Sequence, residues 1–289
     1  MVAQSRAIFP NRDGTRYDRS MTTNPDTWAY GDYAPDPASR DLPGLKAKWL
    51  VEQLPIAASP SVLDYGAGEG KHLHLVRKII PAARLVGVDI RAPRAQVDFE
   101  FHQVPSNAPL PFADNTFDVI ISCDVLEHVE SIDRSLTEIH RVLRTGGSFL
   151  GFVPAEGGPG PHGLFRLLDP NLFRDTKDHR HAFTRRELLD QFGRRFEIAR
   201  LAYSYHLLGA TLDAAFFASF KAPVFGARIE SFWRGQENDF YRAPAATQNQ
   251  RSWASRFIQL ANRAAYYESS LLKSFPLGAK GLHFHLRKH

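Results

Sequence analysis

Cysteine is nearly absent from this 289-residue chain, and long apolar runs are missing. The single cysteine, Cys123, excludes a disulfide within the chain and fits a reducing compartment. No stretch approaches the roughly eighteen uninterrupted apolar residues of a membrane-spanning helix. The opening residues, MVAQSRAIFPNRDG, contain no apolar core of the kind found in a secretory signal peptide. From these absences we expect a cytoplasmic protein.

A strong charge of one sign is also lacking, because the chain has 36 Lys and Arg residues and 31 Asp and Glu residues, which gives a net charge of +5. The basic residues are scattered, apart from a loose group of arginines between residues 185 and 200. A nucleic-acid binder would gather such charge with aromatic residues on one module, so we do not expect a nucleic-acid partner. Attraction to an anionic substrate or surface explains the small excess equally well.

Short apolar strands alternate with amphipathic helices from residue 61 to about residue 201, a rhythm typical of βαβ units and a parallel sheet. The sequence therefore predicts a doubly wound α/β fold. Helices are expected over residues 44–54, 71–79, 131–144 and 184–193, with Thr184 as a helix cap. Strands are expected over residues 61–65, 84–90, 97–102, 117–123, 148–154 and 196–203, with a Gly/Pro-rich loop over 155–163.

The last quarter of the chain departs from this rhythm. Residues 206–280 are aromatic-rich and mostly helical in pattern, whereas 281–288 (GLHFHLRK) have the pattern of a strand. The simplest topology is a helical cap inserted between two strands of one sheet, with a mobile loop near 243–252. The expected organisation is an N-terminal arm or lid (1–41, with Trp28, Tyr30 and Tyr33), a core (42–205), the cap (206–280) and the final strand (281–289).

A glycine turn, Gly66-Ala67-Gly68-Glu69-Gly70, joins the strand at 61–65 to the helix at 71–79. Glycines let a ligand approach the backbone, and the helix start behind them offers free N–H groups. The spacing is GxGxG and not the GxGxxG of nicotinamide-binding folds. Asp64 precedes the turn and can pair with an ammonium group, while Asp89 ends the next strand, where a carboxylate can accept from ribose hydroxyls.

Four ordered segments carry a family resemblance: VLDYGAGEG, LVGVDI, LPFADNTFDVIISCDVLEHV and HRVLRTGGSFLGFVP. They resemble successive motifs of the class I S-adenosylmethionine-dependent methyltransferases, in particular the small-molecule branch related to the menaquinone and ubiquinone C-methyltransferases. The resemblance implies a seven-stranded, mostly parallel Rossmann-like sheet and S-adenosylmethionine as cofactor.

The resemblance also implies roles for particular residues. The backbone of the glycine turn would line the methionine portion, Asp89 with Ile90 would hold the ribose and flank the adenine, and the Cys123 carbonyl would face the ammonium group. An acidic residue that often contacts the adenine amino group is missing, since Ser106 and Asn107 stand near its position. The implied cofactor-binding residues are Asp64, Tyr65, Gly66, Ala67, Gly68, Gly70, Asp89, Ile90, Ser106, Asn107, Cys123 and Asp124.

Methyl transfer to a hydroxyl needs a base, and histidine is the usual base near neutral pH. His128 lies in VLEHV after the fourth strand, and His179 and His181 lie in KDHRHAFT, where Asp178 could orient a neighbouring histidine. His206 at the start of the cap is a further candidate. We expect no metal, because spacing places no further ligand beside Asp178, His179 and His181. His283, His285 and His289 alternate as on one face of an edge strand, and this pattern likewise does not define a metal site.

The acceptor is not fixed by the sequence. Phenylalanines of the cap, including Phe217 and Phe225, either dock the cap on the core or form an apolar pocket or membrane-facing surface. The expected activity is methyl transfer to a small-molecule, glycan or lipid-linked acceptor, at oxygen. Two alternatives stay open, namely a nicotinamide-dependent oxidoreductase and a catalytically inactive, methyltransferase-like binding module.

Overall fold

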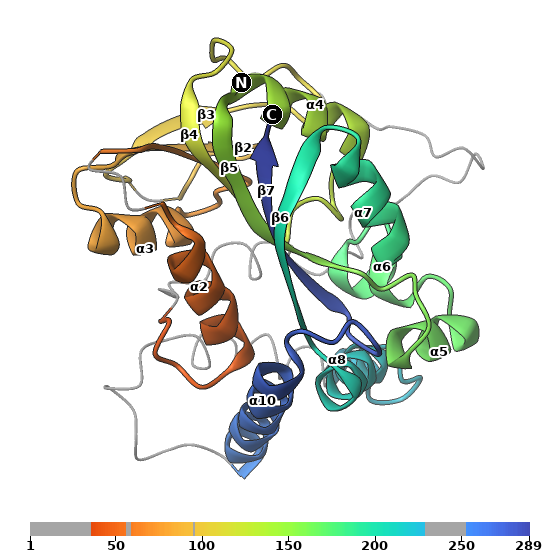
Figure 1. The fold of residues 1–289 in the computed structure, drawn as a ribbon. Helices are drawn as coiled ribbons and strands as arrows, with labels where there is room; N and C mark the ends of the chain where they lie inside the picture. The colour runs from red at the N-terminus through yellow and green to blue at the C-terminus, as the bar shows by residue number, and fades with distance from the viewer. Residues whose placement is uncertain (1–35, 56–58, 95, 229–252) are drawn as a thin grey trace, which may run out of the picture.

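The computed structural model describes residues 36–55, 59–94, 96–228 and 253–289. Its strands form one seven-stranded sheet in the order β3-β2-β1-β4-β5-β7-β6 (Figure 1). Neighbouring strands from β3 to β5 are parallel, whereas β7 is antiparallel to both β5 and β6. The strands are β1 (Ser61–Tyr65), β2 (Arg84–Asp89), β3 (Glu100–Gln103), β4 (Phe117–Cys123), β5 (Leu143–Pro154), β6 (Phe196–Ser204) and β7 (Gly281–Lys288).

Local signals in the sequence account for several helix starts. The Asp41 side chain caps α2 by accepting from the Gly44 N–H at 2.7 Å. Thr184 and Glu187 form a capping box at α7, which confirms the predicted cap. The helices are α2 (Leu42–Gln53), α3 (Lys71–Ile79), α4 (Ile132–Val142), α5 (Pro161–Leu168), α6 (Leu172–Lys177), α7 (Arg185–Gly193), α8 (Leu207–Phe220) and α10 (Trp253–Leu272).

Helices pack on both faces of the sheet, so the predicted doubly wound fold is confirmed. On one face, Leu136 of α4 and Leu188 of α7 join a buried cluster with Phe149 of β5. On the other face, Leu50 of α2 and Leu73 of α3 pack against a second cluster. Burial of these apolar side chains is the main stabilising contribution to the core.

Some expected elements differ from the structure. The helix predicted to reach residue 144 ends at Val142, because Leu143 is fully buried and pairs with Phe117 as the first residue of β5. The strand expected from residue 97 begins at Glu100. Helices α5 and α6 were not predicted; α6 places Leu172 and Phe173 in an apolar cluster with α8.

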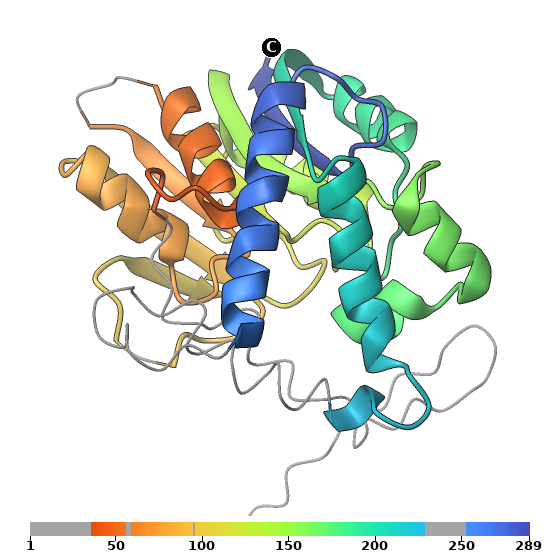
Figure 2. The ribbon, with the colours of Figure 1, turned by 90° about the horizontal axis from the view of Figure 1, so that it is seen from below.

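The final strand occupies the interior of the sheet. β7 pairs with β5 and β6 along both edges, so the expectation that its histidines lie on an edge strand is wrong. The His283 ring is 2% exposed, and its Nε2 lies 2.8 Å from the Ser204 hydroxyl. The chain between β6 and β7 includes α8 and α10, which lie side by side (Figure 2). The predicted arm residues Trp28, Tyr30 and Tyr33 and the predicted mobile loop near 243–252 lie outside the described residues.

Aromatic residues of α8 dock against its neighbours. Phe217 and Phe220 are buried with α6, whereas Phe225 is 58% exposed. The His206 ring is buried, and its Nε2 donates to the Phe275 carbonyl at 2.9 Å. Within the described residues, no helix combines the length and the apolarity needed to cross a membrane.

Candidate active site

The carboxyl ends of β1, β2, β4 and β5 meet at one edge of the sheet, because these strands are parallel. The start of β7 lies at the same edge, since Gly281 pairs with Pro154. The glycine turn after β1 touches the loop after β4: a Cβ on Gly66 would lie 2.3 Å from a Val125 methyl group. Open α/β sheets bind ligands outside this edge.

The glycine turn depends on left-handed backbone. Gly66, Gly68 and Gly70 have φ angles of +85°, +53° and +80°, which side chains rarely adopt. The amides of Gly66 and Ala67 both donate to the Val88 carbonyl, at 2.9 and 3.0 Å. These bonds fix the turn against the end of β2.

Asp64 is a buried carboxylate without a hydrogen-bond partner among the described residues. Its exposed fraction is 0%, and both carboxylate oxygens are unsatisfied. The His72 ring lies close by, with its Nδ1 3.4 Å from Oδ2. An unpaired buried charge is costly, so this carboxylate calls for a cationic partner.

Asp89 braces the turn from the end of β2. Its Oδ2 accepts from the Gly68 N–H at 2.9 Å, and its Oδ1 accepts from the Arg91 N–H at 3.1 Å. Burial raises the pKa of Asp89, although these backbone bonds oppose the rise. Because a carboxylate can accept about four hydrogen bonds, Asp89 keeps capacity for two hydroxyls. The adjoining Ile90 side chain is 56% exposed.

Asn107 and Ser106 lie in the loop after β3. Asn107 has a φ of +61°, and its Nδ2 donates to Glu130 Oε2 at 2.5 Å. Its Oδ1 is buried and has no partner in the described part of the chain, whereas Ser106 is exposed.

Cys123 is the last residue of β4, and Asp124 follows it. Burial raises the pKa of the Cys123 thiol, so this sulfur is no nucleophile near neutral pH. Asp124 has a φ of +55° and accepts from Lys46 Nζ at 2.8 and 2.6 Å. Burial alone would raise the pKa of Asp124, but Lys46 lowers it to about 2. The Tyr65 hydroxyl lies 3.0 Å from that of Ser135, so this ring faces α4.

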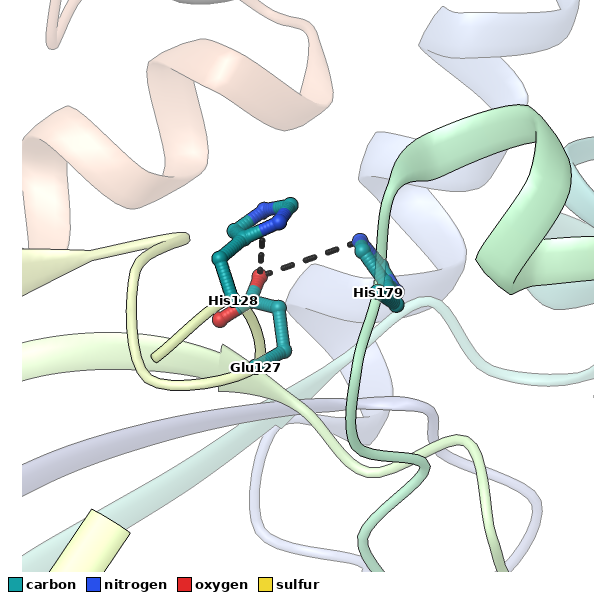
Figure 3. A group of neighbouring side chains, drawn as sticks. All are labelled: Glu127, His128 and His179. Atoms are coloured by element: carbon teal, nitrogen blue, oxygen red, sulfur yellow. Dashed lines mark ion pairs between the residues drawn. The ribbon is translucent and has the colours of Figure 1, made fainter. Parts of the chain in front are cut away.

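Glu127, His128 and His179 form a compact cluster at the same edge. Both rings face the Glu127 carboxylate (Figure 3), with His128 Nε2 at 4.0 Å and His179 Nε2 at 3.9 Å from its Oε1. Glu127 is 0% exposed, and its carboxylate has no hydrogen-bond partner among the residues described. Burial, reinforced by Asp124, holds the pKa of Glu127 well above its usual range.

Hydrogen bonds fix the tautomers of both histidines. His128 Nδ1 lies 2.9 Å from the Asp178 carbonyl, which can only accept, so Nδ1 carries the proton. His179 Nδ1 lies 2.9 Å from Glu156 Oε2. Burial would raise the pKa of Glu156, yet Lys177, His179 and Lys280 hold it well below its usual range. This ionised carboxylate accepts from His179 Nδ1, so Nε2 of each ring faces the cluster.

Two sequence expectations for this loop can be compared with the structure. The expectation that Asp178 orients His179 is wrong: Glu156 does so, and the Asp178 carboxylate makes no hydrogen bond or ion pair within the described ranges. His181 lies outside the cluster. Its Nε2 donates to the Val129 carbonyl at 2.8 Å, and its ring stacks on Phe183.

Comparisons with known proteins agree with this geometry. A family model described as a methyltransferase domain matches residues 63–151. A probable S-adenosylmethionine-dependent methyltransferase from Mycolicibacterium smegmatis is 31% identical over 208 residues, which cover 65% of this chain and 76% of that relative. The chain belongs to the S-adenosylmethionine-dependent methyltransferases.

Other relatives of this methyltransferase match a smaller part of it. A ubiquinone/menaquinone biosynthesis C-methyltransferase from Hahella chejuensis is 31% identical over 128 residues, which cover 40% of this chain and 51% of that relative. The chain spans about half the length of the first curated relatives it matches. The crystal structure of MccD protein aligns with a TM-score of 0.51 at 16% identity, over 84% of this chain and 96% of that one, and it supports the fold alone.

The methyltransferase uses S-adenosylmethionine as its cofactor, and the residues at the edge fit this molecule. S-adenosylmethionine carries an ammonium group, a ribose and an adenine, but no phosphate. The unpaired Asp64 carboxylate fits the ammonium group, and the spare acceptor capacity of Asp89 fits the ribose. The alternative of a nicotinamide-dependent oxidoreductase is therefore set aside.

Sequence reasoning missed three charged residues of the methyltransferase's site. Glu127 directly precedes His128 in the segment VLEHV, so the sequence could have indicated that it lies at the site. Glu156 and Lys46 carried no signal, because their partners, His179 and Asp124, lie 23 and 78 residues away along the chain.

Proposed function

We propose that this methyltransferase transfers its methyl group to a hydroxyl oxygen of a small-molecule acceptor, including glycan or lipid-linked molecules. The observation that carries the proposal is the pair of Nε2 atoms, of His128 and His179, that face the buried Glu127 in the loop where Val125 touches the glycine turn. An acceptor hydroxyl reaching this cluster would be activated there, so that its proton leaves as the oxygen forms the new bond.

We further propose which residues hold the cofactor. Asp64 would pair with the ammonium group, and Asp89 would accept from the ribose hydroxyls, with Ile90 against the adenine. The backbone of Gly66, Ala67, Gly68 and Gly70 would border the methionine portion, as would Tyr65, Cys123 and Asp124, while Ser106 and Asn107 would lie near the adenine amino group. S-adenosylmethionine supplies an activated methyl group on a sulfonium whose thioether leaves without protonation, so the protein provides position and exclusion of water.

A carbon acceptor is the second candidate, because one matched relative is named a C-methyltransferase. Turnover to S-adenosylhomocysteine, measured with a panel of phenols, quinols and sugars, identifies an acceptor. NMR of the methylated product then shows whether carbon or oxygen carries the new group, and a carbon-bound methyl would refute the oxygen proposal.

Three histidine variants test the cluster. A positioned acid or base contributes about 10²–10⁴-fold to a rate, so His128→Gln and His179→Gln should each lose at least tenfold in turnover at unchanged cofactor affinity. His181→Gln, two residues along the same loop, should lose less because its ring bonds to Val129 outside the cluster. Equal losses in all three variants would contradict this assignment.

A further inference from the structure

Three potential ligand atoms converge in the cluster of Glu127, His128 and His179. The Glu127 carboxylate is 0% exposed and has no hydrogen-bond partner among the described residues. The Nε2 atoms of His179 and His128 lie 3.9 and 4.0 Å from its Oε1, too far for a direct hydrogen bond. A buried carboxylate without a hydrogen-bond partner is costly unless a proton or a cation neutralises it.

The separations are slightly larger than those of ligands bound to one ion. Two donors, each about 2.1 Å from a metal, lie at most about 4.2 Å apart. All three ligand atoms of this cluster lie within 4.8 Å of one another, so a small contraction brings them to a common ion. Figure 3 shows the two rings directed at the same carboxylate from two different loops.

The outer contacts are those of a metal centre. Histidine ligands usually donate their second ring nitrogen to a carboxylate or a backbone carbonyl, which fixes the tautomer and the ring orientation. His179 Nδ1 does so to Glu156, and His128 Nδ1 does so to the Asp178 carbonyl, both at 2.9 Å.

We propose that Glu127, His128 and His179 bind one divalent first-row transition cation, and that this cation receives the oxygen of the acceptor. Two imidazole nitrogens with one carboxylate favour ions such as Mn²⁺, Co²⁺ or Zn²⁺ over Mg²⁺ or Ca²⁺, which prefer all-oxygen sites. The sequence did not predict this site, because its ligands come from two segments about 50 residues apart.

The acceptor class follows from the ligand count, and this step rests on the proposed oxygen transfer. Three protein ligands leave positions open for substrate, so the ion suits an acceptor with two adjacent oxygens that chelate it. The bound hydroxyl loses its proton to solvent, since a metal lowers the pKa of a bound O–H group. The oxygen then forms a bond to the methyl carbon as the carbon–sulfur bond breaks. The histidines act as ligands, and the ion activates the hydroxyl.

A second group of potential ligands, Glu156, His162 and Asp213, does not carry the same inference. Two lysine ammonium groups already form ion pairs with its carboxylates. Lys177 Nζ and Lys280 Nζ lie 2.6 and 2.8 Å from Asp213 Oδ2, and each lies 3.2 Å from Glu156 Oε1.

The test is a titration of the full chain, stripped with a chelator, with Co²⁺ followed by visible absorption and with Mn²⁺ followed by electron paramagnetic resonance. The expected result is one ion per chain. Glu127→Gln and His179→Gln should weaken binding by more than about 100-fold, beyond the 10–100-fold typical of losing an outer partner. His74→Gln is the control, because this exposed histidine lies 3.5 Å from Asp98 and models an adventitious surface site.

The outcomes separate this proposal from the proposed function. Absence of binding, or binding that both cluster variants retain, overturns the metal site. Full turnover of an oxygen acceptor in chelator, with loss in His179→Gln, also overturns it and leaves the histidines acting directly. Binding that the cluster variants abolish, together with a carbon-methylated product, supports the site and refutes the oxygen transfer. Thermal unfolding of each variant establishes that it is folded.

Discussion

Asp64→Asn should change cofactor affinity and protein stability in opposite directions. The carboxylate is fully buried, lacks a hydrogen-bond partner among the described residues, and lies 3.4 Å from the His72 ring. Hydrogen bonds to charged groups contribute about 1.5–3 kcal/mol. Loss of the ammonium contact should therefore weaken S-adenosylmethionine binding by about 10–150-fold, since about 1.4 kcal/mol corresponds to a factor of ten.

The same substitution removes an unpaired buried charge from the ligand-free protein. Replacing it with a neutral amide should stabilise that state by about 1–3 kcal/mol, measured as a higher midpoint of denaturant unfolding. Asp190→Asn is a matched control, because Asp190 is 59% exposed and pairs with Arg194 on the surface of α7. This control should change neither quantity.

Calorimetry with three ligands identifies the contact. S-adenosylmethionine and S-adenosylhomocysteine both carry the ammonium group, whereas 5′-methylthioadenosine lacks the amino-acid portion. Asp64→Asn should weaken binding of the first two and leave the third unchanged. An equal loss for all three ligands would refute the pairing with the ammonium group and would point to a general disturbance of the turn.

Three further predictions concern other parts of the molecule. Asp89→Ala should weaken all three ligands by about 1–3 kcal/mol, measured by the same calorimetry, because each ligand carries the ribose; unchanged affinity contradicts this placement. Burial lowers the pKa of His283 to about 3, so only the unfolded chain takes up this proton as the pH falls below about 6.5. The stability that His283 contributes is therefore present above pH 6.5 and lost towards pH 3. In denaturant unfolding, His283→Leu should reduce the slope of stability against pH by up to about 1.4 kcal/mol per unit. Residues 206–280 expressed alone should show no cooperative thermal transition, because α8 packs against α5 and α6; a cooperative transition contradicts the cap assignment.

The sequence was informative wherever a structural cause is local. Turn glycines, strand periodicity and the Thr184 cap are properties of neighbouring residues, and the structure has the predicted turn, alternation and cap. The position of β7 inside the sheet was not readable from its own residues. A strand's place in a sheet depends on which strands pair with it, and β7 pairs with segments far from it along the chain.

In the candidate site, too, contacts between residues close in sequence could be predicted and contacts between distant residues could not. The glycine turn, Asp64 and Asp89 belong to one βαβ unit, so their spacing alone predicts that they meet. Glu127 and His179 come from different connections, which meet because β4 and β5 are parallel neighbours and because the Arg180 and His181 amides donate to the Glu127 carbonyl. Asp178 seemed the partner of His179 because it is adjacent in sequence, whereas Glu156 reaches the ring from the end of β5.

The orientation of His179 is linked to the cap through buried charges. Glu156, which holds the ring, shares Lys177 and Lys280 with Asp213 on α8. These two carboxylates and two ammonium groups balance one another, and breaking such a group by removing one partner typically costs about 3–5 kcal/mol. Asp213→Asn would leave two ammonium groups against one carboxylate and draw Glu156 towards them. A change on α8 would therefore reach the candidate site through the hydrogen bond between Glu156 and His179, which orients the His179 ring.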